Sequence, residues 1–488
     1  MNKGKIWLAA AVSLFMVLVA LFAYVIVSNN KEEKAAKPGK EETVSAPVVQ
    51  DRAGKEALIR IEDDSDAWID EYEKARSAAA GALENEGVSE NAVVEAEVTE
   101  ESGEEPGKDE TSGLSEGAGS EDKKSEEEPA GEASETEESP LEKKADEILA
   151  GMTLEEKIYQ MFILTPEQVT GEELVTSADS KLKKNLIKCP VGGLVYFESN
   201  LKDPDQTREM LDKTKDYCRS SSGLTPFLCI DEEGGRVLRI GSNPSFNVKK
   251  IPAMAEIKSK EKAYAAGETI GKYLKDLGFN VDFAPDADVL TNRANKVIGE
   301  RSFGRDPDIV TRYARAYSNG LHSAGILSTY KHFPGHGVTS DDTHEGLAET
   351  DKDLVELSEA ELIPFMDAHD AGADLVMVSH ISVPSIINDT TPCSLSQYMV
   401  TDVLKGKLDF DGLVITDSLR MGAISSGYTS EEACVLAIKA GNDLLLMPDD
   451  HEAAVAAILE EVRRRRIPQE RIDESVRKII LKKLEISE

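Results

Sequence analysis

The sequence predicts an α/β protein: a (β/α)₈ TIM-type barrel over residues 141–488, preceded by a transmembrane helix and a disordered acidic linker. Three observations lead to this prediction. Eight apolar runs alternate with amphipathic, helix-like stretches after Pro140. The N-terminal end contains a long uncharged segment, and the region between these two parts is acidic and poor in aromatic residues.

The N-terminal segment from Ile6 to Val27 has 22 residues without a charge and follows Lys3 and Lys5. At about 1.5 Å per residue, such a helix spans a hydrocarbon core of about 30 Å. We expect residues 1–28 to be an uncleaved membrane anchor, the alternative being a removed signal peptide, because no small-residue cleavage site clearly follows. Lysines after the span outnumber those before it, but large domains translocate largely regardless of charge. We therefore expect a single-pass cell-membrane protein whose folded domain is extracytoplasmic.

The composition of residues 29–140 predicts a low-complexity linker. Residues 81–140 carry 21 acidic and 3 basic residues, a net charge of −18 against −36 for the whole chain, and no Phe, Tyr or Trp. A segment of this composition cannot bury enough apolar surface to offset the conformational entropy lost on folding, so most of the linker is expected to be disordered. Its charge argues against nucleic acid as a partner.

The eight apolar runs after Pro140 are the expected strands. They span residues 157–164, 191–197, 226–230, 279–285, 326–333, 374–380, 412–418 and 442–448. Runs that are apolar throughout are typical of strands covered on both faces, as in parallel sheets. Eight such strands alternating with helices indicate a barrel. A doubly wound open sheet is the alternative, but it should carry a glycine-rich turn after an early strand, and none follows the first run.

Charged residues follow most of these runs. They are Asp231 after the third, Asp286 and Asp288 after the fourth, Lys331 and His332 at the fifth, His380 at the sixth and Asp417 at the seventh. In a barrel these positions meet at the carboxyl-terminal face. Any one of them could simply cap a helix. The set as a whole indicates a polar site at one mouth of the barrel.

Two motifs carry a resemblance to a known family. KHFPGHG (331–337) followed by Asp342-Thr343-His344, together with GLVITDSLRMGAI (412–424), resembles glycoside hydrolase family 3, and within it the β-N-acetylglucosaminidase branch. Further blocks agree in the same order: MTLEEKIYQMF (152–162), IDEEGGRVLR (230–239), NVDFAPDADV (280–289), VIGERSFGRDP (297–307) and RIDESVRKIILKKL (471–484). The resemblance runs from Leu141 onward and implies a (β/α)₈ barrel, which the strand pattern predicts independently.

The resemblance implies a retaining mechanism with Asp417 as the nucleophile, a carboxylate that forms a covalent glycosyl-enzyme. It also implies that His344 is the general acid/base, with Asp342 as its orienting partner. An unperturbed imidazole titrates near pH ~6.5, so it can give and take a proton near neutrality. The 40 residues after the eighth run read as two helices, so we expect the acid to come from inside the barrel.

Five further residues are expected to bind sugar hydroxyls, because they match the family's positions: Asp231, Arg239, Arg301, Lys331 and His332. Carboxylates accept hydrogen bonds from hydroxyls, and Lys and Arg donate them. His336 is expected to brace the loop. No cofactor and no metal are expected.

Four positions depart from the family's pattern: Glu232 stands where Gln is usual, Ala294 where Pro is expected, Thr343 where Ser is common, and Ser418 where a second Asp is frequent. None removes a catalytic role. Glu232 is expected to add a carboxylate near the sugar site, so it and Ala294 leave the fine substrate preference open.

Two other functions remain open from the sequence. His332, His336, His344 and Asp342 could be ligands in a metal-dependent hydrolase, but Pro334 and Gly335 forbid the helix that the four-residue spacing of the first two would need. A non-catalytic, anchored sugar-binding protein is the other alternative, although Asp417, Asp342 and His344 are all present.

The sequence as a whole predicts a monomeric, membrane-tethered, extracytoplasmic exo-β-N-acetylglucosaminidase that acts on cell-wall muropeptides or related glycans. A β-glycosidase of other specificity and a phosphorylase of the same family are the alternatives, since a histidine acid/base does not repel phosphate as a carboxylate does.

Overall fold

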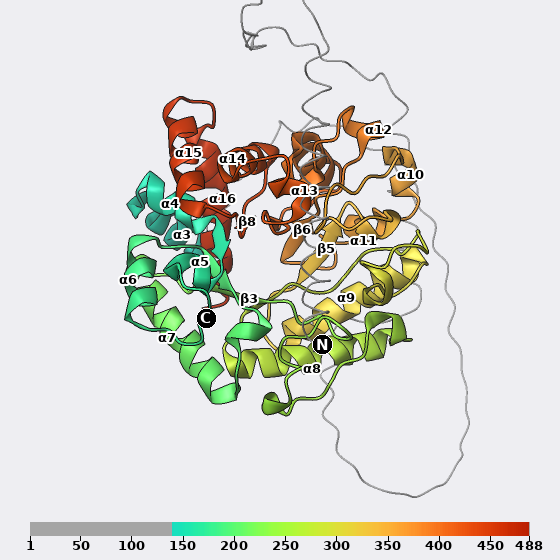
Figure 1. The fold of residues 1–488 in the computed structure, drawn as a ribbon, viewed down its shortest axis with the longest axis horizontal. Helices are drawn as coiled ribbons and strands as arrows, with labels where there is room; N and C mark the ends of the chain where they lie inside the picture. The colour runs from blue at the N-terminus through green and yellow to red at the C-terminus, as the bar shows by residue number, and fades with distance from the viewer. Residues whose placement is uncertain (1–138, 488) are drawn as a thin grey trace, which may run out of the picture. The chain divides into compact units, whose positions relative to one another are not determined.

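The computed structural model describes residues 139–487 (Figure 1). The predicted membrane anchor and all but the last two residues of the predicted linker lie outside this part of the chain. Among the described residues, no helix is both long and apolar enough to cross a membrane.

Eight strands are present in the described part, one within each predicted run. They are β1 (Phe162–Leu164), β2 (Gly193–Val195), β3 (Phe227–Ile230), β4 (Val281–Asp282), β5 (Thr329–Phe333), β6 (Leu375–Val378), β7 (Leu413–Thr416) and β8 (Leu445–Leu446). Every residue of these strands is buried. This burial on both faces is the physical reason why the runs are apolar throughout.

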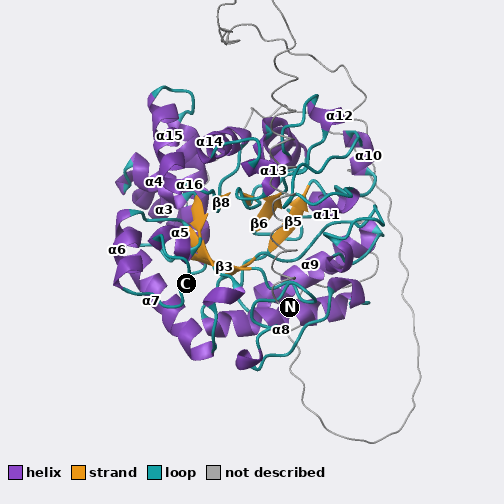
Figure 2. Cartoon of the chain, viewed as in Figure 1, coloured by secondary structure: helices purple, strands orange, loops and turns teal. Residues whose placement is uncertain are grey.

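All strand pairs are parallel, and they form two sheets, ordered β4-β3-β2-β1-β8 and β5-β6-β7. The sheets adjoin at two places. Val281 pairs with Leu327 between β4 and β5, and Ile415 pairs with Leu444 between β7 and β8, both in parallel bridges. The eight strands therefore follow one another in a ring, with the helices outside it (Figure 2). The predicted α/β class is confirmed, and the arrangement is barrel-like.

The helices alternate with the strands along the chain. They are α3 (Pro140–Gly151), α4 (Leu154–Gln160), α5 (Pro166–Thr170), α6 (Ser180–Lys188), α7 (Pro204–Ser222), α8 (Lys260–Leu277), α9 (Pro307–Ser323), α10 (Leu354–Ser358), α11 (Ile363–Met366), α12 (Pro384–Ile387), a π-helix (Tyr398–Lys407), α13 (Gly422–Ser425), α14 (Ser430–Ala440), α15 (His451–Arg463) and α16 (Gln469–Glu485). The last two are the two helices expected after the eighth strand.

The first predicted run is only partly a strand. Lys157 to Gln160 form the last turn of α4, because Thr153 and Glu156 close a capping box that starts a helix at Leu154. The strand is limited to Phe162–Leu164. When no turn residues interrupt an apolar run, the sequence alone does not show where a buried helix ends and a buried strand begins.

Helix α16 lies across the amino-terminal ends of the strands. Lys483 donates to the Gln160 side chain ahead of β1 at 2.7 Å, Lys482 pairs with Asp374 ahead of β6 at 3.2 Å, and Ser475 donates to Asp443 ahead of β8 at 2.5 Å. These contacts close the face of the barrel opposite to the carboxyl ends of the strands.

Lys483 gives a prediction for stability. Burial lowers the pKa of its ammonium group to about 7, against 10.5 for an exposed lysine. Between these values the unfolded chain binds more protons than the folded one, so the free energy of unfolding rises with pH from about 7 to 10. Lys483→Met removes the titrating group, and we expect it to stabilise the protein at pH 6.5 by about 2–4 kcal/mol, with the gain lost by pH 10. Urea unfolding at both pH values measures this.

The control is Lys478→Met on the same helix. Lys478 donates to the Asp411 carbonyl at 3.0 Å at the surface. If Lys483→Met stabilises the protein equally at pH 6.5 and pH 10, this result contradicts the lowered pKa of the Lys483 ammonium group.

Candidate active site

A pocket of about 440 Å³ opens beyond the carboxyl ends of the strands. This volume lies within the usual range for small-molecule sites. The residues that line it come from most of the strand ends around the ring: Val195, Phe197, Asp231, Glu233, Val237, Arg239, Phe283, Arg301, Lys331, His332, His344, Met377, Asp417, Ser418, Arg420, Met421, Leu446 and Met447. The polar site expected at one mouth of the barrel is therefore present as a cavity.

Lys331, on β5, is the centre of a buried charge cluster in this pocket. Its ammonium group donates to Asp231 at 2.9 Å and pairs with Glu233 at 2.7 Å. Glu233 in turn accepts two hydrogen bonds from Arg301, both at 2.8 Å. Burial lowers the pKa of Lys331, but the neighbouring carboxylates outweigh burial and raise the pKa above its ordinary value. Lys331 is therefore held in its protonated form, and its hydrogen bonds to the carboxylates are charge-assisted.

Glu233 was not among the predicted site residues. It is 1% exposed and joins the guanidinium of Arg301 to the ammonium of Lys331. Burial acts to raise the pKa of its carboxyl, but these two cations hold it far below the ordinary value. Glu233 therefore keeps both cations in place at the pocket. In the sequence, only its place in the acidic run Asp231-Glu232-Glu233 after the third strand indicated a role at the site.

We expect Glu233→Gln to lower the free energy of unfolding by about 3 kcal/mol, because it leaves two buried cations with one countercharge fewer. The same change should raise KM for the substrate, since Lys331 and Arg301 lose their fixed positions. Urea unfolding and steady-state kinetics measure the two effects. Glu300→Gln, at an exposed carboxylate beside Arg301, is the control. An unchanged KM would contradict the organising role.

Glu232 does not face the pocket, which corrects the expectation that it adds a carboxylate to the sugar site. Its carboxylate accepts hydrogen bonds from the backbone N–H groups of Arg239, Ile240 and Gly241, at 2.5–2.9 Å, and from the Tyr273 hydroxyl at 2.7 Å. Glu232 thus holds the loop that carries Arg239 in its conformation. The reason is that four donors converge on this carboxylate, and Glu232 is not among the residues that line the cavity.

Arg239 lines the pocket from this loop. Its guanidinium lies over the Phe197 ring, 5.7 Å from the centroid, and 3.6 Å from the Asp231 carboxylate. Its buried Nε has no hydrogen-bond partner among the described residues.

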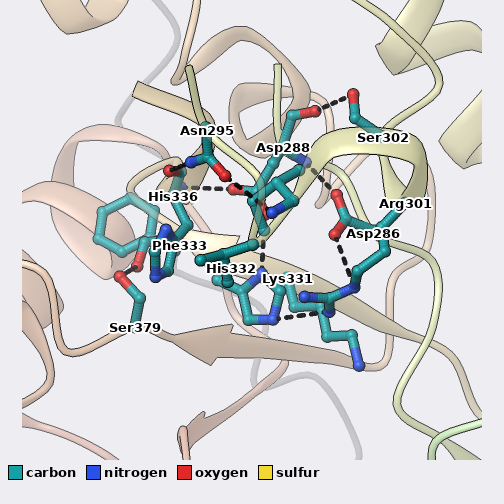
Figure 3. Close-up of polar contacts among 12 residues, drawn as sticks. Asp286, Asp288, Asn295, Arg301, Ser302, Lys331, His332, Phe333, His336 and Ser379 are labelled. Carbon is teal, nitrogen blue, oxygen red and sulfur yellow. Dashed lines mark hydrogen bonds and ion pairs between the residues drawn. The ribbon is translucent and has the colours of Figure 1, made fainter. Parts of the chain in front are cut away.

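His332 lies between Asp288 and Arg301 (Figure 3). Its Nδ1 is 2.7 Å from the Asp288 carboxylate, and its Nε2 is 3.2 Å from the Arg301 guanidinium. Burial acts against the charged form of Asp288, but His332 outweighs it and lowers the pKa of the carboxyl. Burial and the neighbouring Asp288 raise the pKa of Asp286. Because Arg301 donates toward His332 Nε2, that nitrogen is an acceptor and Nδ1 carries the proton.

Asp286, Asp288 and His332 place possible ligand atoms within 4.8 Å of one another. Arg301 lies beside them, 3.6 Å from Asp286, so a fixed cation already balances these carboxylates. The other proposed set, His332, His336, His344 and Asp342, does not form a ligand cluster. Both ring nitrogens of His336 contact threonine hydroxyls at 3.0 Å, Nε2 that of Thr343 and Nδ1 that of Thr339.

Asp417 follows β7 directly and reaches the pocket. Its backbone is held by a hydrogen bond to the Val378 carbonyl at 2.9 Å, and its carboxylate accepts from the Ser418 N–H at 2.7 Å. Burial acts to raise the pKa of this carboxyl, but His332, His380 and the Ser418 N–H together lower it below the ordinary value. Asp417 is therefore an ionised carboxylate on a rigid strand end.

His344 lies on the loop after β5 and also lines the pocket. Its Nδ1 is 2.7 Å from the Asp342 carboxylate, which also accepts from the His344 N–H at 2.9 Å. Burial raises the pKa of Asp342, but these hydrogen bonds outweigh it and lower the pKa. The His344 side chain is 66% exposed, and its Nε2 has no hydrogen-bond partner among the described residues.

The structure thus brings together the predicted residues. Seven of them line one cavity: Asp231, Arg239, Arg301, Lys331, His332, His344 and Asp417. Asp342 stands behind His344 and contacts it directly. The arrangement offers an ionised carboxylate and an exposed, carboxylate-held imidazole over a floor of fixed hydrogen-bonding groups.

Comparison with known proteins identifies relatives of the chain. Residues 153–481 match the model of the glycosyl hydrolase family 3 N terminal domain. A beta-hexosaminidase of Xanthomonas oryzae pv. oryzae is 32% identical over 284 residues, which is 57% of this chain and 81% of that protein. Beta-hexosaminidase A of Pseudoalteromonas piscicida is 32% identical over 289 residues, 56% of this chain. The chain spans 48% of the length of that relative.

Solved structures show the same likeness. A glycoside hydrolase family 3 beta-N-acetylglucosaminidase from Paenibacillus sp. str. FPU-7 superposes with a TM-score of 0.65 at 33% identity. The match covers 69% of this chain and 64% of that structure.

Proposed function

Because the chain belongs to glycosyl hydrolase family 3, we propose that it is a retaining exo-β-N-acetylglucosaminidase that releases terminal N-acetylglucosamine from cell-wall muropeptides or related glycans. The observation that carries the proposal is the meeting, in one pocket, of an ionised Asp417 with an exposed His344 held by Asp342.

In the first step Asp417 attacks the anomeric carbon with a carboxylate oxygen. The bond from this carbon to the leaving oxygen breaks, and the electron pair stays on that oxygen. The low pKa of Asp417 suits this step, because the attacking group must be ionised at neutral pH.

His344 gives its proton to the leaving oxygen as that bond breaks. In the second step the neutral imidazole takes a proton from water, and the water oxygen displaces Asp417 from the sugar. Asp342 orients the ring through Nδ1, so Nε2 is the nitrogen that exchanges the proton, and its carboxylate stabilises the imidazolium.

The remaining predicted residues bind the sugar. Lys331, Arg239 and Arg301 donate to sugar oxygens, and Asp231 accepts from hydroxyls. His332 is held in one orientation between Asp288 and Arg301 and forms part of the wall that the sugar contacts. These contacts set the anomeric carbon in reach of Asp417.

The location in the cell belongs to the same proposal. The uncharged segment from Ile6 to Val27 supports a single-pass anchor, and the acidic linker supports a tether that lets an extracytoplasmic domain reach cell-wall material. A monomer is the proposed state.

Hydrolysis of the p-nitrophenyl glycosides of N-acetylglucosamine, glucose and xylose tests the function. We expect release from the β-N-acetylglucosaminide well above the other two, free N-acetylglucosamine as the product without phosphate, and the same rate with EDTA. A sugar 1-phosphate formed in the presence of phosphate would identify the phosphorylase alternative. Loss of activity in EDTA would favour a metal-dependent hydrolase, and tight sugar binding without turnover would favour the non-catalytic alternative.

A further inference from the structure

The loop that carries His344 is docked on the turn that follows Asp417. The Gly422 N–H donates to the His344 carbonyl at 3.2 Å, and the Ala423 N–H donates to the Thr343 carbonyl at 3.0 Å. Gly422 and Ala423 begin α13, which follows the nucleophile strand. The two groups proposed to act on opposite sides of the same bond are therefore coupled through backbone contacts.

Gly422 has no room for a side chain at this contact. A Cβ atom built on it would lie 2.7 Å from the His344 carbonyl oxygen and 2.9 Å from the Glu345 carbonyl carbon. Both are backbone atoms, so the clash cannot be relieved by turning a side chain. The backbone of Gly422 is not in the left-handed region. Crowding, and not the conformational preference of glycine, is thus what an added methyl group would change.

A second contact also holds the loop. The Thr343 side chain is fully buried, and its hydroxyl is 3.0 Å from Nε2 of His336. His336 is itself buried, and its Nδ1 is 3.0 Å from the Thr339 hydroxyl. The loop is therefore held both by α13 and by His336, which gives His336 the bracing position expected from the sequence.

We propose that Gly422 is a positioning residue for His344, and that the Thr343–His336 contact shares this role. The inference rests on the proposed function of His344 as the general acid/base. A methyl group at position 422 pushes the His344 backbone away from α13, so the imidazole leaves the position from which it protonates the leaving oxygen. Asp417 stays in place, because its own contacts are with Ser418 and β6.

Gly422→Ala in the full-length chain tests this. We expect kcat/KM for phenyl β-N-acetylglucosaminide, which needs proton transfer, to fall by about 10–100-fold, a part of the effect that general acid catalysis can supply. For the 2,4-dinitrophenyl glycoside, which leaves without a proton, we expect less than about a threefold change. Gly427→Ala is the matched control, since Gly427 is exposed and a Cβ there meets nothing within 4 Å.

Thr343→Val provides a second test that leaves Gly422 intact. It removes the hydroxyl that contacts His336, and the same loss for the phenyl substrate alone is expected, with Thr343→Ser restoring the rate. A loss equal for both substrates in Gly422→Ala and Thr343→Val would overturn the inference, as would wild-type rates for both variants. The underlying assignment is tested separately by His344→Ala: if this variant shows no dependence on the leaving group, the proposed function fails first.

Discussion

Replacing Asp417 with alanine is expected to lower kcat/KM for a β-N-acetylglucosaminide by about 10⁴-fold or more, because no other group then forms the covalent bond to the anomeric carbon. The ionised state of Asp417 makes this effect large, since the attacking carboxylate is lost altogether. Steady-state kinetics with the p-nitrophenyl substrate measure the loss.

Asp411→Ala is the matched control for Asp417→Ala. Asp411 lies ahead of β7, at the opposite end of the same strand, and is exposed. A wild-type rate is expected for it. Trapping with a fluorinated N-acetylglucosaminyl fluoride should add one sugar to the wild-type protein at residue 417. A sugar adduct found on any other residue would contradict the assignment.

Replacing His344 with alanine should separate substrates by their leaving groups. We expect kcat/KM for the phenyl glycoside to fall by about 10²–10⁴-fold, which is the usual contribution of general acid catalysis. The value for the 2,4-dinitrophenyl glycoside should fall far less, because kcat/KM reports the step in which the glycosidic bond breaks, and this leaving group needs no proton. Without the general base, the second step becomes slow and limits kcat for the activated substrate. Azide, a nucleophile that needs no general base, should restore this kcat.

The chain contains a close control for this variant. His369 contacts Asp411 through Nδ1 at 2.9 Å, an Asp–His pair of the same kind as Asp342–His344 but ahead of β6 and β7, away from the pocket. His369→Ala should leave both substrates unaffected. Equal losses for the phenyl and dinitrophenyl substrates in His344→Ala would count against a proton-donating role.

The sequence predicts the strands well because strands buried on both faces form nearly continuous apolar runs, and such runs are visible in the sequence. Asp417 and Lys331 could be placed at the mouth of the barrel because each stands where an apolar run ends. Asp342 and His344 are different: they lie on a loop with no periodic pattern, so only the resemblance to a family singled them out.

For Glu232 and Glu233, the sequence does not predict which side chain faces the cavity. They are adjacent, have the same side chain and follow the same strand, yet Glu232 accepts backbone hydrogen bonds from its own loop and Glu233 pairs with Lys331 and Arg301. Which of the two faces the cavity depends on contacts between distant parts of the chain. The docking of His344 on Gly422 is a contact of the same long-range kind.

The position of α3 beside α16 has a consequence for how the protein is oriented. Arg477 of α16 pairs with Asp146 of α3 at 2.7 Å, and α16 itself closes the face of the barrel opposite to the pocket. The polypeptide thus enters the folded domain at the rear. Attachment of the protein to a surface or a bead through the segment ahead of Ser139 therefore leaves the mouth of the pocket free, and capture through this end should not block access to large polymeric material.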